Sequence, residues 1–218
     1  MAIIGNDAMG GEDLGARPDD RLVSPSAERN KGAIAEVLAK VLPHAGTVVE
    51  IGSGTGQHVV HFARVMPSLT WQPTERDADC LRSISAWLSV DAPPNVRPPL
   101  RLDVHADRWP VESADAIVCI NLVHIAPWSA TQALMRGAGC MRGGGVLYLY
   151  GPYRMQGVPT SSSNQAFDAH LRAVNPLWGV RDLGEMSKVA AAAGLTLLQT
   201  SKMPANNLSV VFRRSGSN

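Results

Sequence analysis

Three glycines at alternate positions, Gly52, Gly54 and Gly56, follow a short apolar run. Glycine tolerates positive φ and lets a ligand approach bare backbone. Carboxylates accompany these glycines: Glu50 stands just before them, and Glu75 follows the next apolar run. Bare backbone next to carboxylates suits a polar ligand that presents hydroxyl groups or positive charge.

Alternating strands and helices must bring these residues together. The residue patterns predict helices at 24–42, 57–66, 77–90, 127–141, 164–174 and 182–193, and strands at 48–51, 69–75, 100–104, 114–121, 146–151, 195–202 and 206–214. Residues 143–145 are expected to form a turn and residues 152–163 a loop. The order predicts an α/β protein with a Rossmann-like, doubly wound, seven-stranded, mostly parallel sheet, a C-terminal antiparallel hairpin and helices on both faces.

In such sheets the ligand lies beyond the carboxyl ends of the strands. Four predicted strand ends carry polar residues or glycines. They are the glycines after the first strand, Glu75 at the second, Asp103 at the third, and Asn121 with His124 at the fourth. As a set, these residues predict a binding site at this edge.

The spacing of the glycines separates two ligand classes. A dinucleotide fingerprint, G-x-G-x-x-G, would place its last glycine where this chain has Gln57, whereas the glycine comes one residue earlier, at Gly56. The pyrophosphate of NAD gains nothing from nearby carboxylates such as Glu50. A sulfonium ligand with an α-amino group has two positive centres that carboxylates stabilise. S-adenosylmethionine is therefore favoured, and an NAD(P)-dependent oxidoreductase is the alternative.

Four segments resemble the motifs of class I S-adenosylmethionine-dependent methyltransferases: EIGSGTGQH, TE at the second strand end, LDV at the third and INLVHI at the fourth. With SPSAERNKGAI near the start and NNLSVVFR near the end, the chain resembles a methyltransferase-like family labelled as a domain of unknown function. The resemblance covers about residues 24–214. It implies methyl transfer from S-adenosylmethionine, leaving S-adenosylhomocysteine, to an unidentified acceptor.

The resemblance also implies which residues hold the cofactor. They are Gly52, Ser53, Gly54 and Gly56 around the methionine part, Glu75 at the ribose hydroxyls, Asp103 and Val104 beside the adenine, Asn121 and Leu122 beneath the sulfonium, and Arg29 and Asn30 over the carboxylate or sulfonium side.

Three further residues have two readings each. Glu50 is either a site residue or part of a structural network under the turn. His58 either bonds the cofactor or packs on its helix. His124 is the candidate general base, because histidine titrates near neutrality and this one follows a strand end; alternatively it shapes the floor of the cofactor site.

The composition of the chain limits the classes of binding partner that we expect. The formal net charge of +1 gives no electrostatic reason to expect nucleic acid or an anionic membrane, so a small-molecule acceptor is expected. The cysteines, Cys80, Cys119 and Cys140, lack metal-ligand spacing, and no metal is expected. These three separated cysteines fit a reducing, cytoplasmic location.

Residues 1–23 lack the charge and apolar pattern of a secretory signal and are expected to be a flexible leader or lid. Residues 24–218 are expected to form one S-adenosylmethionine-binding domain. A protein that keeps this fold and binds the cofactor without catalysis is a further alternative.

Overall fold

The computed structural model describes residues 18–91, 93–158 and 160–216. Its main sheet has seven strands in the order β3-β2-β1-β4-β5-β9-β8. These are β1 (Gly46–Ile51), β2 (Leu69–Glu75), β3 (Leu100–Arg101), β4 (Ala114–Ile120), β5 (Met141–Gly151), β8 (Leu195–Met203) and β9 (Asn207–Arg214). Two short strands, β6 (Tyr153–Arg154) and β7 (Arg181–Asp182), pair in parallel as a separate sheet.

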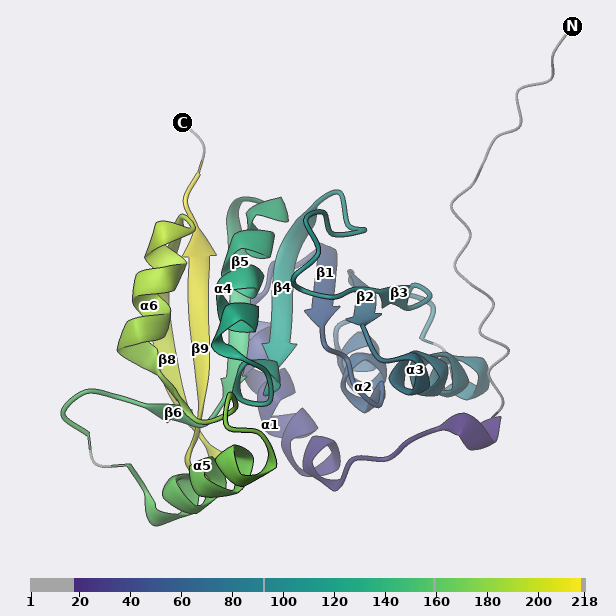
Figure 1. Cartoon of the computed structure of the whole chain (residues 1–218). Helices are drawn as coiled ribbons and strands as arrows, with labels where there is room; N and C mark the ends of the chain where they lie inside the picture. Colours follow the sequence, from purple (N-terminus) through teal and green to yellow (C-terminus); the bar gives the residue numbers. More distant parts are fainter. Residues whose placement is uncertain (1–17, 92, 159, 217–218) are drawn as a thin grey trace, which may run out of the picture.

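Helices cover both faces of the main sheet (Figure 1). The helices on the faces are α1 (Pro25–Val41), α2 (Gln57–Val65), α3 (Ala78–Asp91), α4 (Trp128–Gly137) and α6 (Leu183–Ala192). The remaining helix, α5 (Ser162–Val174), lies at one edge of the sheet (Figure 1). Leu38 of α1 and Phe62 of α2 share a core with one face of the sheet. Leu134 of α4 and Met186 of α6 share a core with the other face. The central strands are thus buried on both sides, as their apolar sequences require.

The strand directions confirm the predicted fold. All pairs from β3 to β5 are parallel, and β9 runs antiparallel to both β5 and β8. The strand order reverses between β1 and β4, which is the position where such sheets bind ligands. In Figure 1 the arrowheads of β1 and β4 point to the edge where α1 and α5 lie.

Two predicted boundaries are wrong. The helix predicted to reach residue 141 ends at Gly137, and Met141 already belongs to β5. The glycines predicted as a turn lie within β5, where Gly144 has a φ of 81° and the pairing with β4 shifts register. A left-handed glycine permits this irregularity without ending the strand.

The edge strand and the loop after β5 also differ from prediction. The strand predicted at residues 100–104 is only two residues long. Residues 152–163 contain β6 and the start of α5, for which Ser161 is the N-cap. Pairing of β6 with the distant β7 carries no local signal, so sequence periodicity could not reveal it.

The described part of the predicted leader lies against α3. The backbone N–H of Leu22 donates to Ser83 Oγ at 2.8 Å, and Trp87 Nε1 donates to the Leu22 carbonyl at 3.0 Å. Ser24 then caps α1, and its side chain accepts a hydrogen bond from the backbone N–H of Ala27. The rest of the predicted leader, residues 1–17, lies outside the described residues.

Candidate functional site

The turn after β1 adopts left-handed backbone at its three glycines. The φ values are 68° at Gly52, 55° at Gly54 and 90° at Gly56. A Cβ on Gly56 would lie 3.0 Å from the Cα of Ile84 in α3, so a side chain there meets fixed backbone. A Cβ on Gly54 would meet nothing within 4 Å. The turn is therefore held tightly at α3, and its centre borders open space.

Glu75 ends β2 and fastens the turn. Its Oε2 accepts a hydrogen bond from the backbone N–H of Gly54 at 3.0 Å. Its Oε1 accepts from the N–H groups of Arg76 at 2.7 Å and Asp77 at 3.2 Å. These bonds fix the carboxylate, which still has lone pairs for the hydroxyl groups of a ligand, since two carboxylate oxygens offer about four acceptor positions.

Glu50 lies beneath the turn with 1% of its surface exposed. Among the described residues its Oε2 has no hydrogen-bond partner. Burial raises the pKa of this carboxyl to about 8; the charge of Glu75 adds to the rise, and a hydrogen bond from Ser53 opposes it. Near neutral pH the group is therefore mostly protonated. A cation placed beside it would favour the ionised form and give the unpartnered oxygen an interaction.

Ser53 joins the two strand ends that flank the turn. Its backbone N–H donates to the carbonyl of Thr74 at 2.9 Å, and its hydroxyl donates to the carbonyl of Glu50 at 3.3 Å. Thr74 Oγ1 donates to the same carbonyl at 2.8 Å. The Ser53 side chain therefore stabilises the frame of the turn.

The helix α1 closes the turn from the other side through Asn30. Asn30 Oδ1 lies 2.7 Å from His58 Nε2. Burial lowers the pKa of His58 to about 4, so the ring is neutral at pH 7. His58 therefore donates to Asn30 and holds α1 against α2.

Sequence reasoning missed a second link between these helices, which Gln57 makes. Gln57 is buried and accepts a hydrogen bond from the backbone N–H of Ser24, while its amide donates to Glu28 Oε2 at 3.2 Å. Gln57 drew attention only as the residue that interrupts the dinucleotide fingerprint. Its partners are distant in sequence, so no local pattern could have identified the contact.

The residues after β4 form the floor beside the turn. Asn121 has a φ of 61°, and its N–H donates to the carbonyl of Tyr150 at 2.9 Å. A Cβ on Gly52 would lie 2.6 Å from Leu122 Cδ1, so the turn and the floor are in contact. Together, the turn, Glu75, Glu50, Asn30, His58 and the pair Asn121–Leu122 make one continuous structure.

His124 lies under this floor. Its side chain is fully buried, and neither ring nitrogen has a partner among the described residues. The ring makes an edge contact with Tyr153 at a centroid distance of 4.8 Å and packs against Gly151. Burial lowers its pKa to about 3. A neutral, enclosed imidazole supports the floor and offers no exposed nitrogen to an acceptor.

The adenine-side candidates are placed apart. The Asp103 carboxylate accepts from the backbone and the ring of His105, both at 2.9 Å, and lies 3.8 Å from Arg76. The N–H of His105 is the main cause that holds the pKa of Asp103 below its usual value. Asp103 borders a shallow cavity that Asp77 also lines. Val104 is instead buried in the core that α4 and α6 cover.

A cavity of about 620 Å³ adjoins the floor at Asn121. Arg29 and Asn30 of α1, Tyr150 at the end of β5, the first half of α5 and the turn between β8 and β9 form its walls. Sequence reasoning did not identify Tyr150 or the β8–β9 turn as part of this cavity, because segments far apart in the sequence form it.

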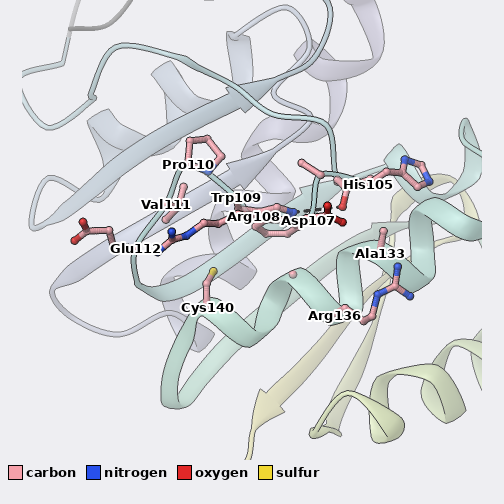
Figure 2. Close-up of a pocket in the computed structure, with 13 residues that line it drawn as sticks. His105, Asp107, Arg108, Trp109, Pro110, Val111, Glu112, Ala133, Arg136 and Cys140 are labelled. Carbon is pink, nitrogen blue, oxygen red and sulfur yellow. Dashed lines mark hydrogen bonds between the residues drawn. The ribbon is translucent and has the colours of Figure 1, made fainter. Parts of the chain in front are cut away.

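A larger hollow of about 990 Å³ lies elsewhere, between the loop 104–112 and α4. Figure 2 shows the loop side chains on one side of it and Arg136 and Cys140 on the other. Trp109 fills part of it and packs directly on Gly137. No glycine of the turn, nor Glu75 or Asn121, borders this hollow. The location of a cavity at the strand ends therefore identifies the candidate site better than the volume of the cavity does.

The described ranges contain neither a candidate metal site nor a membrane-spanning helix. No three or more described His, Cys, Asp or Glu side chains group in a way that could hold a metal ion. None of the described helices has the length and apolar character needed to cross a membrane.

The model of the family described as "Protein of unknown function (DUF938)" matches residues 21–214. The solved structure of the mitomycin 7-O-methyltransferase MmcR superposes with a TM-score of 0.76 at 19% identity, covering 94% of this chain and 59% of that one. An O-methyltransferase family protein from Burkholderia thailandensis gives 0.74 at 16%, covering 88% and 58%.

Human N-acetylserotonin methyltransferase, solved in complex with SAM, gives a TM-score of 0.71 at 14% identity, covering 88% of this chain and 53% of that one. The chain thus spans less than two thirds of the length of these proteins. At such identities the likeness shows the fold, and it confirms the predicted resemblance to the class I methyltransferase fold.

Proposed function

The chain belongs to the family described as protein of unknown function DUF938, and for this member we propose an S-adenosylmethionine-dependent methyltransferase that acts on a small molecule. One juxtaposition carries the proposal. The glycine turn held by Glu75 touches Leu122, and the adjoining Asn121 lines the cavity of about 620 Å³. A cofactor on the turn would present its reacting end to a separate space that an acceptor can occupy.

The described side chains fit this cofactor. The unpartnered Oε2 of buried Glu50 suits a nearby cation, and the cofactor has both an ammonium and a sulfonium group. Glu75 has acceptor positions for the two ribose hydroxyls. The open backbone at Gly54 admits the methionine part. The shared fold with a methyltransferase solved in complex with SAM supports the same assignment.

We assign the remaining residues by their contacts. Gly52 and Gly56 shape the turn, Asn121 and Leu122 form the floor under the reacting centre, and Asp103 borders the adenine side. Asn30, His58 and Ser53 hold the walls in place. Val104 and His124 support the site from within the core.

When bound, the cofactor would supply a methyl group on a cationic sulfur, which a nucleophilic acceptor can take, and the glycine turn with Glu50 and Glu75 would hold it. The protein's own contribution is orientation, through the fixed turn, Glu75 and the floor at Asn121. Such positioning is worth about 7–11 kcal/mol. A general base contributes roughly 3–6 kcal/mol, so the enclosed His124 is not needed as one.

The structure gives the two alternatives less support. Gln57, which breaks the dinucleotide fingerprint, is buried and bonded at both ends of its amide. A pyrophosphate on the turn would lie beside the Glu75 carboxylate, which repels it. A binding protein without catalysis would not require a second cavity beside the floor.

The proposal is tested by isothermal titration calorimetry with S-adenosylhomocysteine. We expect binding by the wild-type protein. Glu75→Ala should weaken it by about 1–3 kcal/mol, the cost of losing a buried hydrogen-bonding partner. The matched control is Glu36→Ala, which removes an exposed carboxylate from α1 and should leave the affinity unchanged. No heat of binding to the wild type would contradict the cofactor assignment.

A further inference from the structure

The cavity beside Asn121 has an uneven distribution of charge. Arg29 is the one charged residue among those that line it, and none of the lining residues is acidic. The Arg29 side chain is exposed, and no ion pair or hydrogen bond joins it to any other side chain in the described ranges. An unpaired guanidinium at the wall of a cavity is a ready partner for a carboxylate or a phosphate.

A smaller cavity of about 250 Å³ adjoins the first, since Asn164 and Asn207 line both. Its charged lining residues are Arg154 and Lys202, and again no lining residue is acidic. Arg154 interacts electrostatically with Asp168, whereas Lys202 has no ion pair within the described residues. Cations that surround one space raise the local concentration of anions there.

The carboxyl groups of the site lie at the glycine turn instead. Glu75 fastens the turn, and Glu50 lies buried beneath it. The cavity beside Asp103 is mixed in charge, because Arg76 and Arg101 line it together with Asp77 and Asp103. Arg29 therefore stands out as a cation in a cavity whose lining residues include no acidic one.

The uncharged lining residues describe the rest of the acceptor. Phe167 of α5 is 38% exposed, and Pro152 and Pro204 add apolar surface to the cavity. These residues suit a planar or apolar body. Burial raises the pKa of Tyr150, so its hydroxyl keeps its proton and can donate a hydrogen bond to an acceptor oxygen.

We propose that the methyl acceptor is a small organic anion, with a carboxylate or phosphate on a planar or apolar body, whose anionic group pairs with Arg29 while its nucleophile faces Asn121. This inference rests on the methyltransferase function proposed above. It gives Arg29 to the acceptor, whereas the sequence resemblance gives it to the cofactor. The two assignments predict different results for one variant.

The test uses two probes of the same shape, 4-hydroxybenzoate and 4-hydroxybenzamide, with protein saturated by S-adenosylhomocysteine. Their affinities are measured by ligand-observed NMR titration. The anionic probe should bind at least about tenfold more tightly than the amide, the expected scale for one charge-assisted hydrogen bond. Arg29→Gln should remove most of this preference and leave the affinity for S-adenosylhomocysteine within about twofold.

Two lysine variants complete the experiment. Lys202→Gln should reduce the preference by roughly two- to threefold, because that cation acts from the adjoining cavity. Lys188→Gln is the matched control: Lys188 is exposed on α6, where it pairs with Glu185, and its loss should change nothing.

The possible results separate three claims: the anionic acceptor, the assignment of Arg29 and the proposed function. Equal binding of the two probes, or binding of neither, overturns the inference while the cofactor titration still supports the function. A preference that persists in Arg29→Gln, together with weaker binding of S-adenosylhomocysteine, assigns Arg29 to the cofactor and also overturns it. Absence of S-adenosylhomocysteine binding by the wild type contradicts the proposed function, and this inference with it.

Discussion

The proposed site has two walls of different construction. The glycine turn, Glu50 and Glu75 form the wall that we assign to the cofactor, here called the cofactor wall. Helix α5 and the β8–β9 turn form the wall that we assign to the acceptor, here called the acceptor wall. The cofactor wall follows directly from paired central strands, and its carboxyl groups are at most 9% exposed. The acceptor wall is built after β5. Its helix α5 has 13 residues, of which only Asn164 and Leu171 are buried.

The acceptor wall is held by local contacts instead. Asn164 Nδ2 donates to the carbonyl of Asn206 at 3.0 Å, and Asn206 Nδ2 donates to Ser163 Oγ at the same distance. Ala205 and Asn206 both have positive φ, near 56° and 57°. Such a wall can change without disturbing the strands that we propose hold the cofactor, and variation of this kind lets one fold serve many acceptors.

The largest expected effect concerns Glu50 and the pH dependence of stability. Its pKa is about 8 in the folded protein against 4.5 as the ordinary value. Between these values the folded protein binds one more proton than the unfolded chain. Stability should therefore fall as pH rises, by at most roughly 1.4 kcal/mol per pH unit, and level off above the folded pKa.

Urea unfolding at several pH values between about 5 and 9 measures this slope. Glu50→Gln, which keeps the shape of the protonated group, should flatten it, whereas Glu36→Gln on the surface of α1 should not. Identical slopes in the wild type and Glu50→Gln would show that Glu50 ionises normally under the turn.

A smaller effect is expected from Gly56→Ala. The new Cβ would sit at a φ of 90° and 3.0 Å from the Cα of Ile84, so we expect a loss of about 1–3 kcal/mol of stability and weaker binding of S-adenosylhomocysteine. Gly32→Ala gives the opposite case, because this helical glycine has open space around it. That variant should gain about 0.5–1 kcal/mol. Thermal unfolding of both compares them, and equal shifts would contradict the assigned strain.

The smallest effect should appear in the acceptor wall. Asn164→Ala removes the bond to the Asn206 carbonyl, which is worth about 1 kcal/mol. We expect faster amide hydrogen exchange in α5 and weaker binding of 4-hydroxybenzoate, with S-adenosylhomocysteine affinity unchanged. Gln165→Ala, one residue along the same helix and exposed, is the control. If Asn164→Ala weakens S-adenosylhomocysteine binding as much as probe binding, the two walls are not independent.

The difference between the cofactor wall and the acceptor wall also explains which parts of the site the sequence could predict. The glycines, Glu75 and Asn121 stand at the ends of strongly apolar strands, so period and topology place them at one edge. The strand register then brings Glu75 to the N–H of Gly54. The sequence also favoured the cofactor class, because carboxylates near the turn do not suit a pyrophosphate.

The sequence did not predict the acceptor wall, because the contacts that form it join segments far apart in the chain. Asn207 and Tyr150 lie in strands whose hydrophobic pattern predicts burial but no contact with a ligand. The short strand β6 pairs with a strand 28 residues later in the chain, since Tyr153 pairs with Arg181. His124 shows the other limit. Its place after a strand left two readings open, a general base or a support of the floor, and only the structure shows that the ring is fully buried.

The position of S-adenosylhomocysteine in crystals grown with it is the most direct test of the proposed site. We predict density along the glycine turn, with the ribose hydroxyls on Glu75 and the sulfur above Asn121, facing the cavity that Arg29 lines. Density in the larger hollow beside Trp109, or none at the turn in crystals that hold the ligand elsewhere, would contradict the central claim.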